Sequence, residues 1–190
     1  MTTGTLEEAR LTLISALRER ALVVGEVTLA SGKTAGYYVD ARRALLCQPG
    51  FGAAGRLVAA KAGELGARAV GGMSIGADPI ACAAIADPDG AELAAFLVRK
   101  ERKEHGLQRW VEGPLLEPGT RCLVVEDVVT TGGSTVQAIE RVREQGLEIA
   151  GVVAVLDRLA GGAEAIEQAA AAPFTALTTI DDVYPDRPDA

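Results

Sequence analysis

Short aliphatic runs alternate with helix-like segments along most of the chain, and this alternation is the feature that most limits its fold. The runs lie at 67–73, 93–98, 121–127, 149–156 and 174–180. They are apolar almost throughout rather than at every second residue, which is typical of strands covered on both faces. The sequence therefore predicts an α/β fold with a mainly parallel sheet flanked by helices.

Helical patterns occupy most segments between these strands. Thr5–Glu8 forms a capping box that opens a helix, and helical spacing recurs at 51–65, 79–86, 136–142 and 163–171. Two shorter strands are expected at 22–29 and 37–39, on either side of the turn SGKTAG. At 190 residues, the chain fits a single domain, 1–190. The acidic, proline-containing end at about 181–190 is expected to be a loose tail.

Charge and composition argue against several classes of protein. The formal net charge of -7 is unfavourable for broad nucleic-acid binding. The three cysteines form no CxxC pair, so reduced thiols in a cytoplasmic protein are the simplest interpretation. No apolar segment is long enough to span a bilayer, and the first residues lack the apolar run of a signal peptide. We therefore expect neither a nucleic-acid nor a membrane partner.

The run Val124–Thr135, VVEDVVTTGGST, points most directly to a ligand. Two carboxylates, Glu126 and Asp127, fall at the end of an aliphatic strand, where open parallel sheets bind their ligands. The small residues that follow let backbone N–H groups and a helix N-terminus approach an anion. This combination suits a phosphorylated sugar, with the carboxylates on its hydroxyls and the turn around its phosphate. An ordinary Ser/Thr cap would explain TGGST alone but not the whole run.

A second phosphate motif is incomplete. Ser31–Thr34 contains GKT, but a P-loop requires glycine at position 27, where this chain has Val27. The segment also continues into strand-like residues rather than a helix. We therefore exclude nucleoside triphosphate binding at this point.

A basic segment at 98–113, VRKERKEHGLQRWVEG, contrasts with the acidic remainder of the chain and holds its single histidine. A solvated helix with internal ion pairs is the simplest explanation of a charge run alone. This run, however, directly follows a strand end, and Gly106 and Gly113 would let it move. Several cations closing over a multiply charged leaving group would stabilise its charge and exclude water.

The run 124–135 resembles the ribose-phosphate motif of type I phosphoribosyltransferases. The resemblance implies the fold of that family and the binding of phosphoribosyl pyrophosphate (PRPP). It also implies that Glu126 and Asp127 meet the ribose hydroxyls, while residues 130–135 hold the 5-phosphate. The residues implied at PRPP in this motif are Glu126, Asp127, Val128, Val129, Thr130, Thr131, Gly132, Gly133 and Ser134.

Three further segments resemble the orotate phosphoribosyltransferase family. They are RKERKEHG at 99–106, similar to the family's catalytic loop; LASGKTAGYYVDAR at 29–42, similar to its N-terminal segment; and LDR at 156–158. The resemblance implies that Arg99, Lys100, Lys103 and His105 serve the pyrophosphate. It implies catalytic roles for Lys103, His105 and Asp127.

The same resemblance implies an orotate site at Thr130 and Arg158, where a guanidinium would grip the orotate carboxylate. Two positions depart from the family pattern. Ala30 stands where many members have a lysine near the substrate, which makes Lys33 a further candidate for orotate. Ile75 stands where many members have a lysine for pyrophosphate.

The implied reaction joins orotate to PRPP, giving orotidine 5'-monophosphate and pyrophosphate in de novo pyrimidine (UMP) biosynthesis. Mg²⁺ would bind through PRPP and water rather than directly to the protein. The family also implies a homodimer that shares the loop 99–109, and a small hood built largely from residues 1–45. Two alternatives stay open: a phosphoribosyltransferase for a purine base, and a PRPP-sensing regulator of the same fold. A purely structural domain is least favoured.

Overall fold

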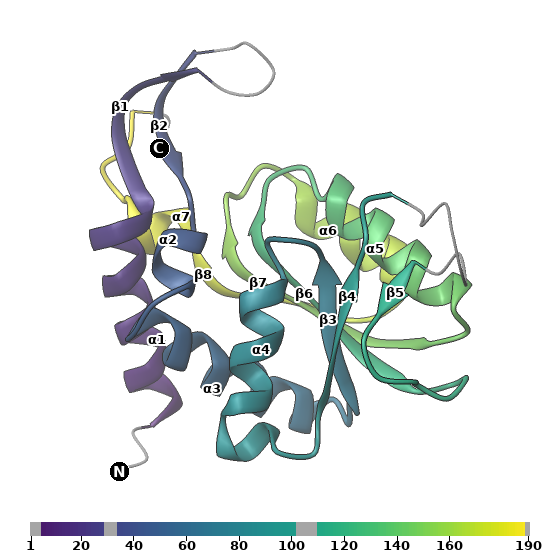
Figure 1. Ribbon diagram of the computed structural model, residues 1–190. Helices are drawn as coiled ribbons and strands as arrows, with labels where there is room; N and C mark the ends of the chain where they lie inside the picture. Colours follow the sequence, from purple (N-terminus) through teal and green to yellow (C-terminus); the bar gives the residue numbers. More distant parts are fainter. Residues whose placement is uncertain (1–4, 29–33, 102–109, 189–190) are drawn as a thin grey trace.

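The computed structural model describes residues 5–28, 34–101 and 110–188, and it confirms the mainly parallel α/β fold (Figure 1). The central sheet has the strand order β5-β4-β3-β6-β7-β8. Its parallel strands are β3 (Ala69–Met73), β4 (Ala94–Val98), β6 (Arg121–Val129), β7 (Glu148–Asp157) and β8 (Phe174–Thr179). The short strand β5 (Val111–Glu112) runs antiparallel to β4 at one edge.

Helices cover both faces of this sheet. One face carries α1 (Leu6–Ala16), α3 (Gly50–Glu64) and α4 (Asp78–Ala86), and the other carries α5 (Gly133–Glu144) and α6 (Gly162–Ala170). The shorter helical elements are a π-helical turn (Leu17–Ala21), α2 (Arg42–Leu45), a 3₁₀ turn (Pro88–Gly90) and α7 (Ile180–Val183). Within the described ranges, none of the helices has the length and apolarity needed to cross a membrane.

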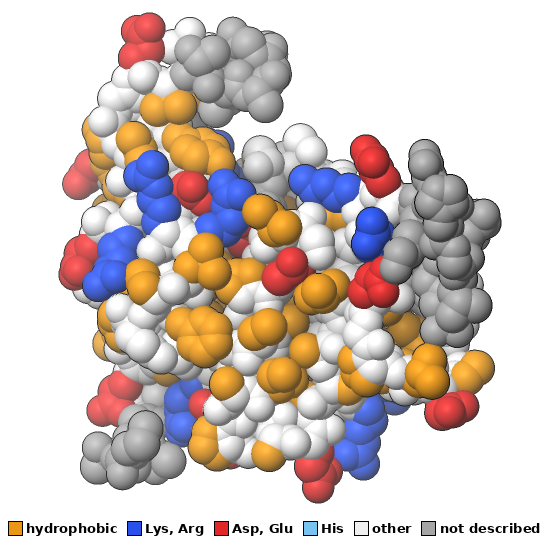
Figure 2. Space-filling view, in the orientation of Figure 1, with side chains coloured by type: hydrophobic (Ala, Val, Ile, Leu, Met, Phe, Trp, Pro, Cys, Tyr) orange, Lys and Arg blue, Asp and Glu red, His pale blue; other side chains and the backbone are white. Residues whose placement is uncertain are grey.

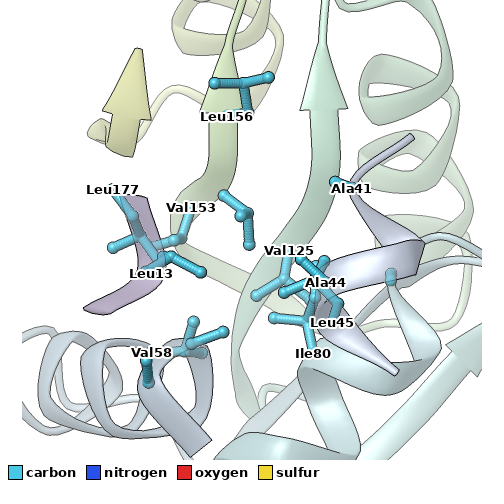
Figure 3. Packing of buried hydrophobic residues seen from close by; sticks show 14 of the residues in the cluster. Leu13, Ala41, Ala44, Leu45, Val58, Ile80, Val125, Val153, Leu156 and Leu177 are labelled. Carbon is cyan, nitrogen blue, oxygen red and sulfur yellow. The ribbon is translucent and has the colours of Figure 1, made fainter. Parts of the chain in front are cut away.

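The inner strands read as continuous apolar runs because both of their faces are buried. On β6, Val125 packs in the cluster that contains Leu13, Val58 and Ile80 of the first helical layer (Figure 3). Its neighbour Val124 packs in the cluster of α5 and α6 on the opposite face. Successive side chains of a strand point to opposite faces, so a strand covered by two helical layers has no polar side.

An antiparallel hairpin stands apart from the central sheet. Strand β1 (Leu22–Thr28) pairs with β2 (Thr34–Val39), and the hairpin extends beyond α2 in Figure 1. Its base is fixed by Tyr37, whose ring meets the ring of Tyr184 edge-on with 5.4 Å between the centroids. The end of β2 is thereby held close to the C-terminal residues.

The expected loose tail is wrong for the residues just after β8. Residues 180–183 form α7, whose first turn is closed by a capping box between Thr179 and Asp182. Arg10 of α1 donates a hydrogen bond of 2.7 Å to the Asp182 carboxylate. Ile180 and Val183 are buried in the core, so two apolar side chains anchor a segment that otherwise has an acidic, solvated composition.

Candidate active site

Two adjoining hollows lie at the carboxyl end of β6. The first, of about 180 Å³, is lined by Arg42, Met73, Ser74, Ile75, Gly76, Lys100, Glu126, Asp127, Val128 and Ser134. The second, of about 270 Å³, is lined by Tyr38, Val39, Asp40, Arg42, Asp127, Val128, Thr130 and Arg158. Arg42, Asp127 and Val128 line both, so they form the wall at which the two hollows meet.

The turn between β6 and α5 is shaped by close packing against the start of α6. Gly132 has φ 80°, and a Cβ there would lie 3.0 Å from the carbonyl oxygen of Gly162. Gly162 is equally confined, because its Cβ would lie 2.6 Å from the carbonyl oxygen of Thr130. Only residues without a side chain allow this approach. The turn is thus held directly before the N-terminus of α5.

Glu126 is buried and already has partners within the protein. Its Oε2 atom accepts hydrogen bonds from the Ser134 hydroxyl at 2.6 Å and from the Thr135 hydroxyl at 3.0 Å. Burial raises the pKa of Glu126 to about 7; the charge of Asp127 also raises it, while the two hydroxyl donors lower it. A substantial fraction of this carboxyl is therefore protonated near neutral pH.

Asp127 is more accessible than its neighbour and faces the loop after β3. Its Oδ1 atom accepts a hydrogen bond of 2.9 Å from the backbone N–H of Val128. A Cβ at Gly76 would lie 2.6 Å from the same oxygen, so that loop passes against the carboxylate. Asp127 therefore presents a carboxylate at the junction of the two hollows.

Arg158 joins the end of β7 to the hairpin. Its Nη2 atom donates a hydrogen bond of 2.9 Å to the hydroxyl of Tyr37, and its guanidinium lies 4.8 Å from the centre of the Tyr37 ring. The backbone N–H of Arg158 donates to the carbonyl of Val129, next to Thr130 in the second hollow. Its buried Nε atom has no hydrogen-bond partner among the described residues. A cation is thus placed in the wall of the second hollow.

The structure brings together most of the described site residues that the sequence predicts. The first hollow contains Lys100, Glu126, Asp127, Val128 and Ser134, and the second adds Thr130 and Arg158. Thr131 and Gly132 lie in the turn before α5 and Gly133 is its first residue; none of the three lines either hollow, and Val129 is buried beside them. Lys33, Lys103 and His105 lie outside the described residues.

Arg99 lies at the edge of the site rather than in either hollow. Its Nη1 atom is 3.4 Å from a carboxylate oxygen of Glu112 on β5. It lines a further recess of about 360 Å³ that shares Ser74 and Lys100 with the first hollow. Arg99 is therefore beside the predicted pyrophosphate region, at the start of the basic segment.

Sequence reasoning missed Arg42 and Asp40. Arg42 follows β2, and its Nε atom donates a hydrogen bond of 2.8 Å to Asp40. This hydrogen bond is the main reason that the pKa of Arg42 is raised, and the charge of Asp127 adds to the effect. The pattern YVDAR at 38–42, which alternates polar side chains at a strand end, was the available signal.

Comparisons with known proteins agree with this geometry. The model of the phosphoribosyl transferase domain family matches residues 77–170. An orotate phosphoribosyltransferase of Corynebacterium glutamicum is 46% identical over 176 residues, which cover 93% of this chain and 94% of that protein. Orotate phosphoribosyltransferase of Mycobacterium tuberculosis, solved with Fe(III) dicitrate, has a TM-score of 0.83 and 41% identity, covering 93% of this chain and 99% of that one.

The Mycobacterium tuberculosis enzyme has also been solved in complex with PRPP, and that structure has a TM-score of 0.78 and 37% identity. It covers 92% of this chain and 98% of the solved chain. The chain therefore belongs to the orotate phosphoribosyltransferase family.

Proposed function

We propose that this protein transfers the 5-phosphoribosyl group of PRPP to orotate, giving orotidine 5'-monophosphate and pyrophosphate, in de novo pyrimidine biosynthesis. The observation that carries the proposal is the meeting of two hollows at Asp127. One hollow suits a phosphorylated sugar and its leaving group, and the other suits a planar anion. The reacting carbon of the sugar would lie between them.

The proposed reaction exchanges one bond at the anomeric carbon. The bond from this carbon to the pyrophosphate oxygen breaks, and the electron pair leaves with pyrophosphate. A ring nitrogen of orotate, reacting as the anion, forms the new bond, so no strong base is needed. Asp127 would bind the ribose hydroxyls and stabilise the positive charge that develops on the sugar. Arg99, Lys100, Lys103 and His105 would bind the departing pyrophosphate.

Arg158 would select orotate by binding its carboxylate. A planar guanidinium can donate two parallel hydrogen bonds to such a group. Tyr37 supports this role because it holds one edge of the guanidinium and lies against its face. Thr130 and Lys33 are the other proposed orotate contacts. The 5-phosphate would bind at residues 130–135, which form the turn and the N-terminus of α5.

Mg²⁺ is the proposed cofactor, bound through PRPP and water. Among the described residues, no group of three or more His, Cys, Asp or Glu side chains is arranged to hold a metal ion. Asp127 offers hard oxygen atoms that fit a hydrated Mg²⁺, whereas Glu126 is committed to two hydroxyls. When bound, the ion would neutralise charge on the leaving group.

A cytoplasmic homodimer that shares the loop 99–109 completes the proposal. Figure 2 supports a dimer, because hydrophobic side chains gather on the face over α3 and α4. Leu46 and Ile85, at the end of α2 and on α4, are exposed large apolar residues. Contiguous exposed apolar side chains are typical of an interface. The proposed hood of residues 1–45, within a single domain of 1–190, would cover the second hollow.

A direct assay tests the reaction. Orotate consumption, followed by its ultraviolet absorbance, should require both PRPP and Mg²⁺. Adenine and xanthine, added in excess, should neither compete with orotate nor be consumed. Consumption of a purine in place of orotate would favour the purine alternative. PRPP binding without turnover of any base would favour the regulator.

A further inference from the structure

Arg42 occupies a position that no other cation of the described site shares. It lines both hollows, whereas Lys100 lines only the first and Arg158 only the second. Asp127 is the acidic residue of the same shared wall. The wall between the two hollows thus carries one residue of each charge where the reacting bond of the proposed reaction would lie.

The guanidinium of Arg42 is held on one side and available on the other. Its Nε atom donates to Asp40 Oδ1 at 2.8 Å, and Asp40 is only 20% exposed. Within the described part of the chain, the two terminal nitrogens of Arg42 have no hydrogen-bond acceptor. An arginine fixed at Nε keeps up to four N–H donors for a ligand. Asp40 therefore orients the group without consuming its binding capacity.

A purely structural Asp40–Arg42 pair is the simplest competing explanation. Arg43 provides the comparison, because it also pairs with Asp40, at 3.8 Å, but lines neither hollow and is 59% exposed. If Asp40 needed only charge neutralisation, either arginine would supply it. The location of Arg42 in both hollows is what a ligand contact requires and a structural pair does not.

The first hollow is short of side-chain cations for a multiply charged leaving group. Among its described residues, Lys100 is the only cation besides Arg42, while Glu126 and Asp127 are acidic. Ile75, from the loop after β3, contributes an apolar side chain that is 65% exposed. A phosphate oxygen close to the sugar would therefore depend on Arg42 for neutralisation.

We infer that Arg42 is a further catalytic residue, which donates hydrogen bonds from its terminal nitrogens to the pyrophosphate end of PRPP next to the ribose. As the bond from the anomeric carbon to pyrophosphate breaks, negative charge grows on the departing oxygen. Arg42 stabilises this charge and keeps its own protons throughout. Asp127, on the same wall, stabilises the opposite charge on the sugar. This inference rests on the proposed function, because it assigns Arg42 to the pyrophosphate end of the proposed substrate PRPP.

The test compares Arg42→Gln with Arg43→Gln. Loss of hydrogen bonds from a charged donor corresponds to a change of about 10- to 100-fold in affinity. Arg42→Gln should raise the KM for PRPP and the Kd for magnesium pyrophosphate, measured by calorimetry, by this factor, and should lower kcat. Its KM for orotate should stay close to that of the wild type. Arg43→Gln should resemble the wild type in all four quantities.

Three outcomes would overturn the inference: equal behaviour of the two variants, a selective rise in the KM for orotate, or an equal rise for both substrates. If Arg42→Gln does not fold, as judged by circular dichroism, Arg42→Lys keeps the charge but loses the planar fork. It should then show the same selective weakening of pyrophosphate, to a smaller extent. Failure of the wild-type protein to consume orotate would refute the proposed function. In that case, selective loss of pyrophosphate binding in Arg42→Gln would still support the assignment of Arg42 as a pyrophosphate contact.

Discussion

The hydroxyl of Ser134 donates a 2.6 Å hydrogen bond to Oε2 of Glu126, across the turn that joins β6 to α5. This contact gives the two adjacent acids of the site different roles. Glu126 is buried and ties the turn to the strand, whereas Asp127 faces the junction of the hollows. The carboxylate pair is therefore one accessible anion beside one internal hydrogen-bond acceptor.

The raised pKa of Glu126 predicts how stability depends on pH. The pKa rises from 4.5 to about 7 on folding, so the folded chain retains a proton that the unfolded chain releases in this range. Protonated Glu126 therefore contributes to the free energy of unfolding fully below about pH 4.5, and this contribution is lost as pH rises through 7. The loss amounts to at most about 3 kcal/mol. Glu126→Gln cannot ionise and should remove this loss.

Denaturant titrations of wild type and Glu126→Gln, near pH 5 and near pH 8, measure the difference. The variant should gain stability relative to the wild type at the higher pH. Because both chains carry the same other titrating groups, the comparison isolates Glu126. A constant difference between the two proteins at both pH values would show that Glu126 is already ionised at the lower pH.

Gly76→Ala should displace Asp127 without unfolding the protein. The new Cβ would lie 2.6 Å from Asp127 Oδ1, and a side-chain oxygen can move where backbone cannot. A misplacement of about 1 Å in a catalytic group can cost up to about 100-fold in rate. We expect kcat to fall strongly with little change in Tm. Gly63→Ala, in α3 with no atom near its added Cβ, is the control and should keep full activity.

Arg158→Ala should weaken the binding of orotate far more than the binding of PRPP. Loss of one partner of a buried charged pair costs on the order of 2–5 kcal/mol. Tyr37→Phe removes only the hydroxyl that holds the guanidinium, so its effect should have the same direction but be smaller. The KM values of both substrates provide the measurement. An equal rise in the KM values of orotate and PRPP would count against binding of the orotate carboxylate by Arg158.

The fold could be predicted from the sequence because strands that are buried on both faces are continuous apolar runs. Strand β3 was expected at 67–73 and observed at Ala69–Met73, and β7 was expected at 149–156 and observed at Glu148–Asp157. Strand β5 was missed because two residues cannot display a period. Its pairing depends on Leu97 and Val98 of β4 rather than on its own residues.

The site was predictable where one continuous segment forms it and not where the fold assembles it. Glu126 and Asp127 could be found because strand, acids and turn are contiguous. Arg42 was missed, because the alternation in YVDAR is also typical of a solvated strand end until β2 is placed over the end of β6. The hydroxyls of Ser134 and Thr135 looked like phosphate ligands, but their contact with Glu126 appears only in three dimensions.

Asp182→Asn should destabilise the contact between α1 and α7. Burial opposes ionisation of Asp182, but hydrogen bonds from Thr179 and Arg10 outweigh it and lower its pKa. The stabilising contribution is therefore present above the unfolded pKa and lost as pH falls through the folded pKa. Loss of the cap and the ion pair together should cost about 1–2 kcal/mol and lower Tm at neutral pH.

Asp181→Asn is the matched control for this measurement. Asp181 pairs with Arg187; the arginine side chain is 11% exposed, but the Asp181 side chain is 61% exposed. The Asn side chain still offers an oxygen that can accept from Arg187, and water solvates the rest of the group, so the substitution should cost little. Its Tm should remain close to the wild type. Equal Tm values for the two variants would mean that the Arg10–Asp182 contact does not hold α7 against α1.

The shared-site dimer predicts recovery of activity when two inactive variants are mixed. Asp127→Asn damages the receiving site, and Lys103→Ala damages the loop that the resemblance assigns to the neighbouring subunit. Each variant alone should be nearly inactive with its fold intact, because transition-state interactions are lost. In a mixed dimer, one site combines an intact loop with an intact Asp127, and the other site carries both defects.

The expected size of the recovery follows from two-fold symmetry. If subunits of an equal mixture exchange at random, half of the dimers are mixed and half of their sites are intact, so activity should reach roughly a quarter of wild type. Subunit exchange is confirmed separately, with one variant carrying an affinity tag that retains the other. If the loop closes over its own subunit, every site keeps a defect. Confirmed exchange without recovery would thus refute the shared site and leave the roles of Asp127 and Lys103 unaffected.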